Sequence, residues 1–342
     1  MRLRRSLVAA GLALTTASVA ARDADPRMPG GGAARRERVH SYQGRNRGPE
    51  QTDRFSRRIK IGRDGRVSVQ NISGDITVTG GPGDEVSIEA VKRARGDQSQ
   101  LASVHIDVDE RSGRVDIRTT HTERNDRVSV DYTITVPSSA GVEVKSISGT
   151  LKVANVQGAV RADTVSGNVT TSDTPRLESA KSVSGDILLT GAASDGDLTA
   201  GSVSGSVTAK GVKSRGLDLS SVSGDVIVTD VTCDRLGIKS VSGNVEYSGA
   251  ITKGGRYDIA SHSGNVRLTL ANPSGFELNA NSFSGSIRSD LPLTIGGDSD
   301  RRGRERGGRD AMNNHTIHAT YGDGSATLTV RSFSGNIVIA KR

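Results

Sequence analysis

A four-residue motif, Ser-x-Ser-Gly or a close variant of it, recurs along most of this chain, and apolar residues keep fixed distances from its glycine. Between Gly149 and Gly285 the spacing of successive motifs stays between 18 and 21 residues. The motif glycines are Gly74, Gly149, Gly167, Gly185, Gly205, Gly224, Gly243, Gly264, Gly285 and Gly335. A short fixed period of this kind is typical of stacked repeats, in which each repeat forms one rung of a solenoid.

The positions around the glycine, counted as position 0, predict two β-strands in each rung. Position +2 is aliphatic in all ten copies, position −5 is apolar in all ten, and position −7 is apolar in nine. The exception is Glu178, which lies beside Leu177. Since side chains alternate along a strand, positions −7 and −5 share the inner face of one strand, and +2 and +4 share that of a second.

Position −2 is also apolar or aromatic, with one histidine. Its members are Ile72, Ile147, Val165, Val183, Val203, Val222, Val241, His262, Phe283 and Phe333. We predict that this position points inward too, so that His262 packs inside and Phe283 and Phe333 thicken the core. Because the step from −5 to −2 is odd, this prediction requires a bend or bulge in the strand.

The motif glycine and the residue after it predict a corner between the two strands. Glycine suits a place where a side chain would be crowded or the backbone needs a positive φ. Position +1 is Asp, Asn, Ser or Thr in every copy. Such residues hydrogen-bond local backbone at turns, and stacked rungs would align them as an outward polar ladder.

Two insertions interrupt the repeats, at about residues 80–140 and 290–326. The first contains alternating segments at 86–91, 104–108, 115–118 and 128–136, with a turn at Glu110–Gly113. These segments predict an antiparallel hairpin layer at the N-terminal end, where it would shield a rung edge. The predicted fold is all-β, a single-stranded parallel β-helix of about ten rungs with an N-terminal β-hairpin insertion.

The N-terminal residues predict export. Residues 1–21 combine a basic start, a short apolar run and a small-x-small cleavage pattern, as in a secretory signal peptide; an uncleaved anchor is the alternative. Residues 22–58 predict a disordered basic linker, which is a solvated spacer or a contact with an anionic surface. The solenoid would span residues 59–342. The expected location is the periplasm or the cell surface.

The formal charge of +8 belongs to the N-terminal part of the chain. The signal peptide carries three Arg, and residues 22–58 carry ten Arg against five acids, so 8 − 3 − 5 leaves residues 59–342 without net charge. Aromatic residues are only 3% of the chain and Trp is absent. Both facts fit slim aliphatic rungs better than a large conventional core.

The rung pattern, together with the segments Tyr132–Pro137 and Val142–Gly149, resembles the bacterial β-strand-repeat family that carries the name "putative adhesin". The resemblance covers roughly residues 59–342. It implies a domain of unknown function that forms a single-stranded β-helix, related to the head domain of autotransporter adhesins and right-handed by analogy. The family has no established catalytic residues, so none is carried over.

The sequence predicts no catalytic residue, no cofactor and no metal site. The motif serine recurs on nearly every rung, as a structural element would, and Gly201–Gly205 does not match G-x-S-x-G. His315 and His318 would point to opposite faces of a strand. Asp84 lies one place too early for a calcium-binding repeat. The candidate polyanion contacts are Arg301, Arg302, Arg304, Arg306 and Arg309.

Three hypotheses of function stay open. The first is a non-enzymatic envelope or surface protein that binds an envelope component or polysaccharide in an adhesin-like way, with no nucleic acid as partner. The second is a carbohydrate-active β-helix enzyme, which would need a cleft with clustered acids. The third is self-association, as in a structural solenoid that assembles through its ends.

Overall fold

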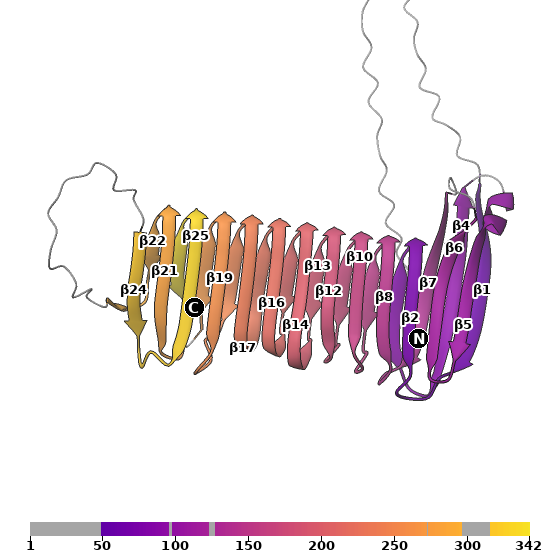
Figure 1. Ribbon diagram of the computed structural model, residues 1–342, viewed down its shortest axis with the longest axis horizontal. Coiled ribbons are helices and arrows are strands. Elements are labelled where there is room, and N and C mark those ends of the chain that lie inside the picture. The colour runs from indigo at the N-terminus through magenta and orange to yellow at the C-terminus, as the bar shows by residue number, and fades with distance from the viewer. Residues whose placement is uncertain (1–48, 96–97, 123–126, 272, 296–314) are drawn as a thin grey trace, which may run out of the picture. The chain divides into compact units, whose positions relative to one another are not determined.

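A computed structural model describes residues 49–95, 98–122, 127–271, 273–295 and 315–342. It confirms the all-β class, because strands stack side by side along nearly all of this part of the chain (Figure 1). One short 3-10 helix, Gln98–Ser103, is the exception among the described residues. No helix in these ranges has the length and hydropathy to cross a membrane.

The strands form two sheets that face each other across an apolar core. We call the sheet whose repeat strands end at the motif the motif sheet, and the other the facing sheet. In spatial order the motif sheet holds β5 (Val104–Arg111), β6 (Arg114–His121), β2 (Arg66–Ser73), β8 (Gly141–Ser148), β10 (Val160–Ser166), β12 (Leu177–Ser184), β14 (Ala193–Ser204), β16 (Lys213–Ser223), the second part of β17 (Val226–Ser242), β19 (Arg256–Ser263), β25 (Ala326–Ser334), β21 (Phe276–Ser284), β24 (His315–Tyr321) and β23 (Thr294–Ile295).

The facing sheet follows the same order of repeats. It holds β1 (Glu50–Lys60), β4 (Glu85–Arg95), β7 (Val128–Pro137), β3 (Ile76–Gly81), β9 (Leu151–Ala154), β11 (Val169–Ser172), β13 (Ile187–Thr190), β15 (Val207–Lys210), the first part of β17, β18 (Val245–Gly249), β20 (Val266–Leu270), β26 (Ile337–Lys341) and β22 (Ile287–Ser289). Each repeat thus contributes one strand to each sheet, and neighbouring repeats pair in parallel.

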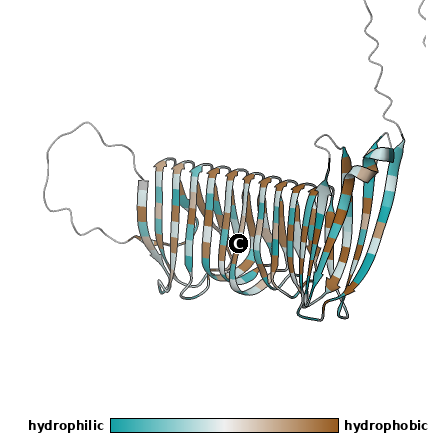
Figure 2. Cartoon of the chain, turned by 45° about the vertical axis from the view of Figure 1, so that its right-hand side comes forward, coloured by the Kyte–Doolittle hydropathy of each residue, from teal (hydrophilic) through white to brown (hydrophobic). Residues whose placement is uncertain are grey.

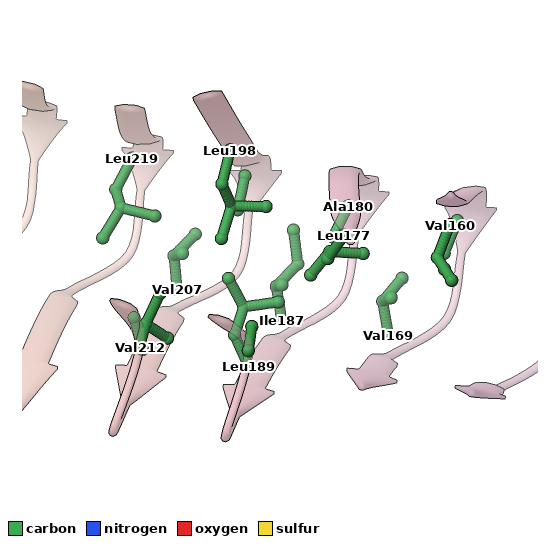
Figure 3. Close-up of a cluster of buried hydrophobic side chains, with 14 of the residues drawn as sticks. Val160, Val169, Leu177, Ala180, Ile187, Leu189, Leu198, Val207, Val212 and Leu219 are labelled. Atoms are coloured by element: carbon green, nitrogen blue, oxygen red, sulfur yellow. The ribbon is translucent and has the colours of Figure 1, made fainter. Parts of the chain in front are cut away.

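The core consists of the columns at −7, −5, +2 and +4, as the sequence predicts. Leu198, Val207 and Leu219 point into the space between the sheets (Figure 3). Hydropathy alternates along the strands, so apolar residues face inward and polar residues face outward at most positions (Figure 2). Leu177 pairs with Val160 in place of Glu178, and a register shift follows it. This irregularity keeps the −7 column apolar.

The motif glycine makes the predicted corner. Gly185 has φ +157, and a Cβ there would lie well inside contact distance of the Gly167 carbonyl oxygen on the next rung. The same clash with the preceding glycine recurs at Gly205 and Gly224. A side chain is therefore excluded by the close stacking of one corner on the next.

The second corner follows the facing-sheet strand at position +6. Asn155, Asp173 and Asp230 have φ between 51 and 57 there, and Gly191 and Gly211 have φ of 63 and 60. Asn, Asp and Gly are the residues that tolerate this left-handed conformation. These residue types at position +6 are therefore a sequence signal for the second corner.

The polar ladder at +1 forms, but its hydrogen bonds join rungs. Asn168 Oδ1 accepts the backbone N–H of Asp186 at 2.9 Å, and Asp186 Oδ1 accepts that of Ser206 at 2.8 Å. Asp225 and Asn244 repeat the same contact with their neighbours. Position +1 therefore stabilises the stacking of rungs and not only the local turn.

Antiparallel strands cover the first rungs. β5 and β6 form a hairpin around Ser112 and Gly113, and Gly113 has φ 69. On the facing sheet β1 and β4 pair antiparallel along their whole length, and β4 continues onto β7. Residues 50–58, which the sequence assigns to the linker, therefore belong to β1. Residues 1–48, with the predicted signal peptide, lie outside the described residues.

The last rungs do not stack in the order of the sequence. The C-terminal strand β25 lies between β19 and β21, so the repeat of Gly335 is inserted between those of Gly264 and Gly285. β24 then pairs antiparallel with β21 and runs the opposite way in Figure 1. The second insertion thus adds strands beyond the repeat of Gly285.

Candidate binding surface

The prediction for position −2 is wrong, because these side chains point outward. Six aliphatic members are between 44% and 54% exposed, and Phe333 and Phe283 are 49% and 36% exposed. We call this row the apolar column; in spatial order it runs Ile147, Val165, Val183, Val203, Val222, Val241, His262, Phe333 and Phe283. Ile72, on the first repeat, is half-buried.

The apolar column faces outward because the strand keeps its alternation without a bulge. Position −3 points inward instead, and it carries the buried serine of the motif, as at Ser202. Ser202 Oγ donates to the Gly185 carbonyl oxygen at 2.8 Å, and Ser221 Oγ donates to that of Gly205 at 2.9 Å. The recurring serine therefore satisfies a backbone acceptor of the neighbouring corner, and the residue after it must face out.

The apolar column gathers nearly all of the large apolar side chains that this structure exposes. Within the described residues only Ile295 is an exposed large hydrophobic residue outside it. Scattered apolar residues on a surface are ordinary, but a contiguous row indicates a contact surface. The column lies beside the C-terminal ends of the motif-sheet strands, where the arrowheads line up in Figure 1.

The C-terminal end of the apolar column is aromatic. The His262 and Phe333 rings stack with centroids 4.8 Å apart, and Phe333 stacks on Phe283 at the same distance. These rings are exposed, so the prediction that they thicken the core is wrong. They border a shallow hollow of about 520 Å³ that Lys239, Ala260, Asn281 and Arg331 also line. Here the surface combines apolar rings with hydrogen-bond donors.

A larger open groove lies among the loops that join facing-sheet strands to motif-sheet strands. It measures about 1150 Å³ and is lined by Asp64, Ser139, Gln157, Ala159, Arg161, Pro175, Arg176, Glu178 and residues 193–197. Two of its acids are engaged with arginine. Glu178 Oε2 accepts a hydrogen bond from Arg161 Nε at 2.6 Å, and Asp197 Oδ2 accepts one from Arg235 at 3.0 Å.

The other sequence candidates are not brought together in the described residues. His318 lies exposed on β24, and in the described ranges no group of three or more His, Cys, Asp and Glu side chains could hold a metal ion. Cys233 is buried, and burial raises the pKa of its thiol to about 12. Arg301, Arg302, Arg304, Arg306 and Arg309 lie outside the described residues.

Residues 176–340 match the family model described as Toastrack DUF4097. This segment of the chain is therefore similar to Toastrack DUF4097 domains. The resemblance to the β-strand-repeat family with adhesin members is thereby confirmed. The Toastrack match begins at β12, whereas the same two-sheet stack already includes β8 and β10.

Two solved structures are similar to this chain over most of its length. One is a "putative cell adhesion protein" from Clostridium sporogenes, with 7% identity and a TM-score of 0.28, covering 85% of this chain and 100% of that one. The other is a "putative adhesin" from Bacteroides fragilis, with 12% identity and a TM-score of 0.38, covering 84% and 96%. At these values the likeness indicates no shared activity or ligand. No curated protein matches the sequence.

Proposed function

We propose that this protein is a non-enzymatic, exported solenoid of the envelope or cell surface, which binds or scaffolds in an adhesin-like way through the apolar column. The observation that carries the proposal is the concentration of exposed apolar side chains in one row. Solvating such a row is unfavourable, and a partner that covers it gains the hydrophobic free energy of that area. Removal of residues 1–21 on export and a right-handed helix of about ten rungs are parts of the proposal.

The test is capture of envelope components by the mature protein and by a column variant. Val203→Asp with Val222→Asp places two charges in the middle of the apolar column, and Thr208→Asp with Ile227→Asp is the matched control at outward position +3 of the facing sheet on the same rungs. We expect the column variant to lose capture and the control to keep it. Equal capture by both variants would refute the role of the apolar column.

A carbohydrate-active enzyme is the second candidate, and the open groove favours it. Glu178, Asp195 and Asp197 lie along one groove that is large enough for several sugar units. The arginine contacts of Glu178 and Asp197 argue for a structural role of these two carboxylates. Turnover of envelope or plant polysaccharides by the mature protein, lost on Asp195→Asn, would establish the enzyme and replace the first proposal.

A further inference from the structure

We propose that the partner covering the apolar column is a second copy of this chain, paired in parallel about a two-fold axis that runs along the solenoid. The inference rests on the proposed function, since it names the partner of the same surface. In this pair the apolar column of one copy lies against that of the other, and both copies point the same way. Three observations support it: the extent of the column, its period and the charges beside it.

The extent of the apolar column fits a dimer interface. Its side chains, each about half exposed, would bury roughly 400 Å² of apolar area per copy. A pair therefore buries roughly 800 Å² before any flanking residue is counted, somewhat below the ~1,000 Å² of a specific interface. The polar columns on each side supply the remainder and form the rim.

The period of the apolar column matches best with itself. From Ile147 to Phe283 it crosses eight rung steps in the pairing order, at about 4.8 Å each, or roughly 40 Å. A row of this length, with one side chain on each rung, is complemented best by a surface with the same spacing. A second copy presents the same row, and in the parallel pair each side chain meets its own equivalent along the whole length of the column.

The two flanks of the apolar column carry opposite charge. On one side, position −4 holds Lys145, Lys181, Lys239 and Arg331 against Asp163, a net charge of +3. On the other side, around the glycine corner, position +1 holds three aspartates and neutral residues, a net charge of −3. The three aspartates are Asp75, Asp186 and Asp225.

Lys145 and Arg331 pair with Glu143 and Asp258 of their own chain, but several of the other flank charges have no such partner. Within the described residues, Lys181 and Lys239 form no ion pair, and neither do Asp186 and Asp225. Each of the two aspartates uses Oδ1 to accept a backbone N–H of the next rung, which leaves its negative charge without a cation. Charges on both sides of an apolar row are suited to select one orientation of a partner.

The direction of the two-fold axis decides which flanks of the two copies face each other. With the two-fold axis along the solenoid, the basic flank of one copy faces the acidic flank of the other. With the axis across the solenoid, basic faces basic and acidic faces acidic, which is unfavourable. The charges therefore favour the parallel pair.

The match extends to single rungs. In the parallel pair Lys181 faces Asp186 of the same rung in the other copy. Lys239 lies one rung from Asp225 of the other copy, because the repeats of Gly224 and Gly243 are neighbours. Lys145 lies one rung from Asp75 in the same way, since β2 and β8 are neighbours. All three lysines of the basic flank thus find an acid within one rung step.

The first experiment is sedimentation of the mature protein over a range of concentrations. We expect a reversible dimer whose dissociation constant rises roughly 10- to 100-fold in Val203→Asp with Val222→Asp, because the centre of the interface is lost. The control Thr208→Asp with Ile227→Asp places the same charges on the outer side of the facing sheet, outside the proposed interface, and should leave the dissociation constant unchanged. A wild-type protein that stays monomeric at every concentration overturns the proposal.

The second experiment fixes the orientation with single cysteines and a short bismaleimide linker. Val165→Cys and Val241→Cys lie four rungs apart, or roughly 19 Å. In the parallel pair each variant cross-links with itself, whereas an antiparallel pair allows self-linking of at most one of them. Wild type is the background control, because its single cysteine, Cys233, is 2% exposed. Linking only between the two variants in a mixture would overturn the parallel arrangement.

A charge-reversal mixture tests the flanks. Lys181→Glu alone and Asp186→Lys alone each place like charges opposite each other, so each should dimerise less. An equimolar mixture restores both opposite-charge pairs in a mixed dimer and should associate more than either variant alone. If the mixture behaves as the average of its components, the flanks do not meet and the proposed orientation is wrong.

The two proposals can fail separately. If the protein is monomeric but the column variant loses envelope capture, the apolar column binds another partner and only the dimer is refuted. If the dimer forms and depends on the apolar column while envelope capture is unchanged in the column variant, the pairing stands and the envelope contact lies elsewhere.

Discussion

Position −2 and position +2 of the repeat carry the same kind of residue in opposite surroundings. Val222 and Val226 lie four residues apart on either side of Gly224, yet Val222 is 44% exposed and Val226 is fully buried. The difference shows that an apolar column in a repeat sequence need not be a core column. The register of the strand decides its side, and here a buried serine holds that register.

The largest expected difference comes from placing an aspartate at each of these two positions. Val226→Asp should unfold the domain or cost more than about 4 kcal/mol, since the carboxylate would be buried without a partner. Val222→Asp should change the free energy of unfolding by about 0.5 kcal/mol or less, as an exposed substitution does. Denaturant titration measures both, with maleimide labelling of Cys233 as the probe of unfolding. Equal effects at the two positions would contradict the register described here.

The next largest effect should come from the corner between the two positions. Gly205→Ala places a methyl group against the Gly185 carbonyl oxygen, so we expect a loss of about 2–3 kcal/mol. Gly196→Ala is the matched control, since its Cβ would make only an ordinary contact at 3.6 Å with Ser194. Thermal unfolding of the two variants separates crowding from the general effect of alanine for glycine. A similar melting temperature for both would mean that the corners are not tightly stacked.

A smaller effect should follow removal of the serine that keeps the apolar column outward. Ser202→Ala leaves the Gly185 carbonyl oxygen without its side-chain donor, which should cost about 1–2 kcal/mol. Ser240→Ala is the control, because Ser240 Oγ is buried without a hydrogen-bond partner in the described residues. The free energy of unfolding should therefore be nearly unchanged in Ser240→Ala. A Ser240→Ala variant as unstable as Ser202→Ala would indicate that packing of the serine, and not its hydrogen bond, matters.

The smallest expected effect concerns Asp116, which points away from the core on β6 and is nevertheless buried. The Arg114 guanidinium binds Asp116 through Nε and Nη2 and lowers the pKa of this carboxyl below 3.8. Because the folded pKa is the lower one, the stabilisation is present above about pH 4 and is lost as the pH falls through the folded pKa. The stability difference between wild type and Asp116→Asn should therefore shrink below about pH 4. A difference that stays constant down to pH 2 would contradict this ion pair.

Much of the fold follows from the sequence alone. The spacing of the glycines, the aliphatic residues at +2 and −5 and the polar residue at +1 determined a two-strand rung with a glycine corner, because a crowded corner admits only glycine, turns favour short polar residues and buried strand positions favour aliphatic ones. The alternating segments 104–108 and 115–118, with a turn at Gly113, likewise predicted the hairpin of β5 and β6.

The tertiary structure decided two things that no local pattern contains. The outward direction of the apolar column depends on Ser202 and its equivalents, whose partner is a carbonyl on another rung about twenty residues away. The place of the last repeat depends on β25 pairing with β19 rather than with the end of the stack. Both are contacts between distant parts of the chain, and alternation alone fits an inward or an outward column equally well. The candidate surface was therefore visible in the sequence as a row of apolar residues, but only the packing of rung on rung placed that row outside.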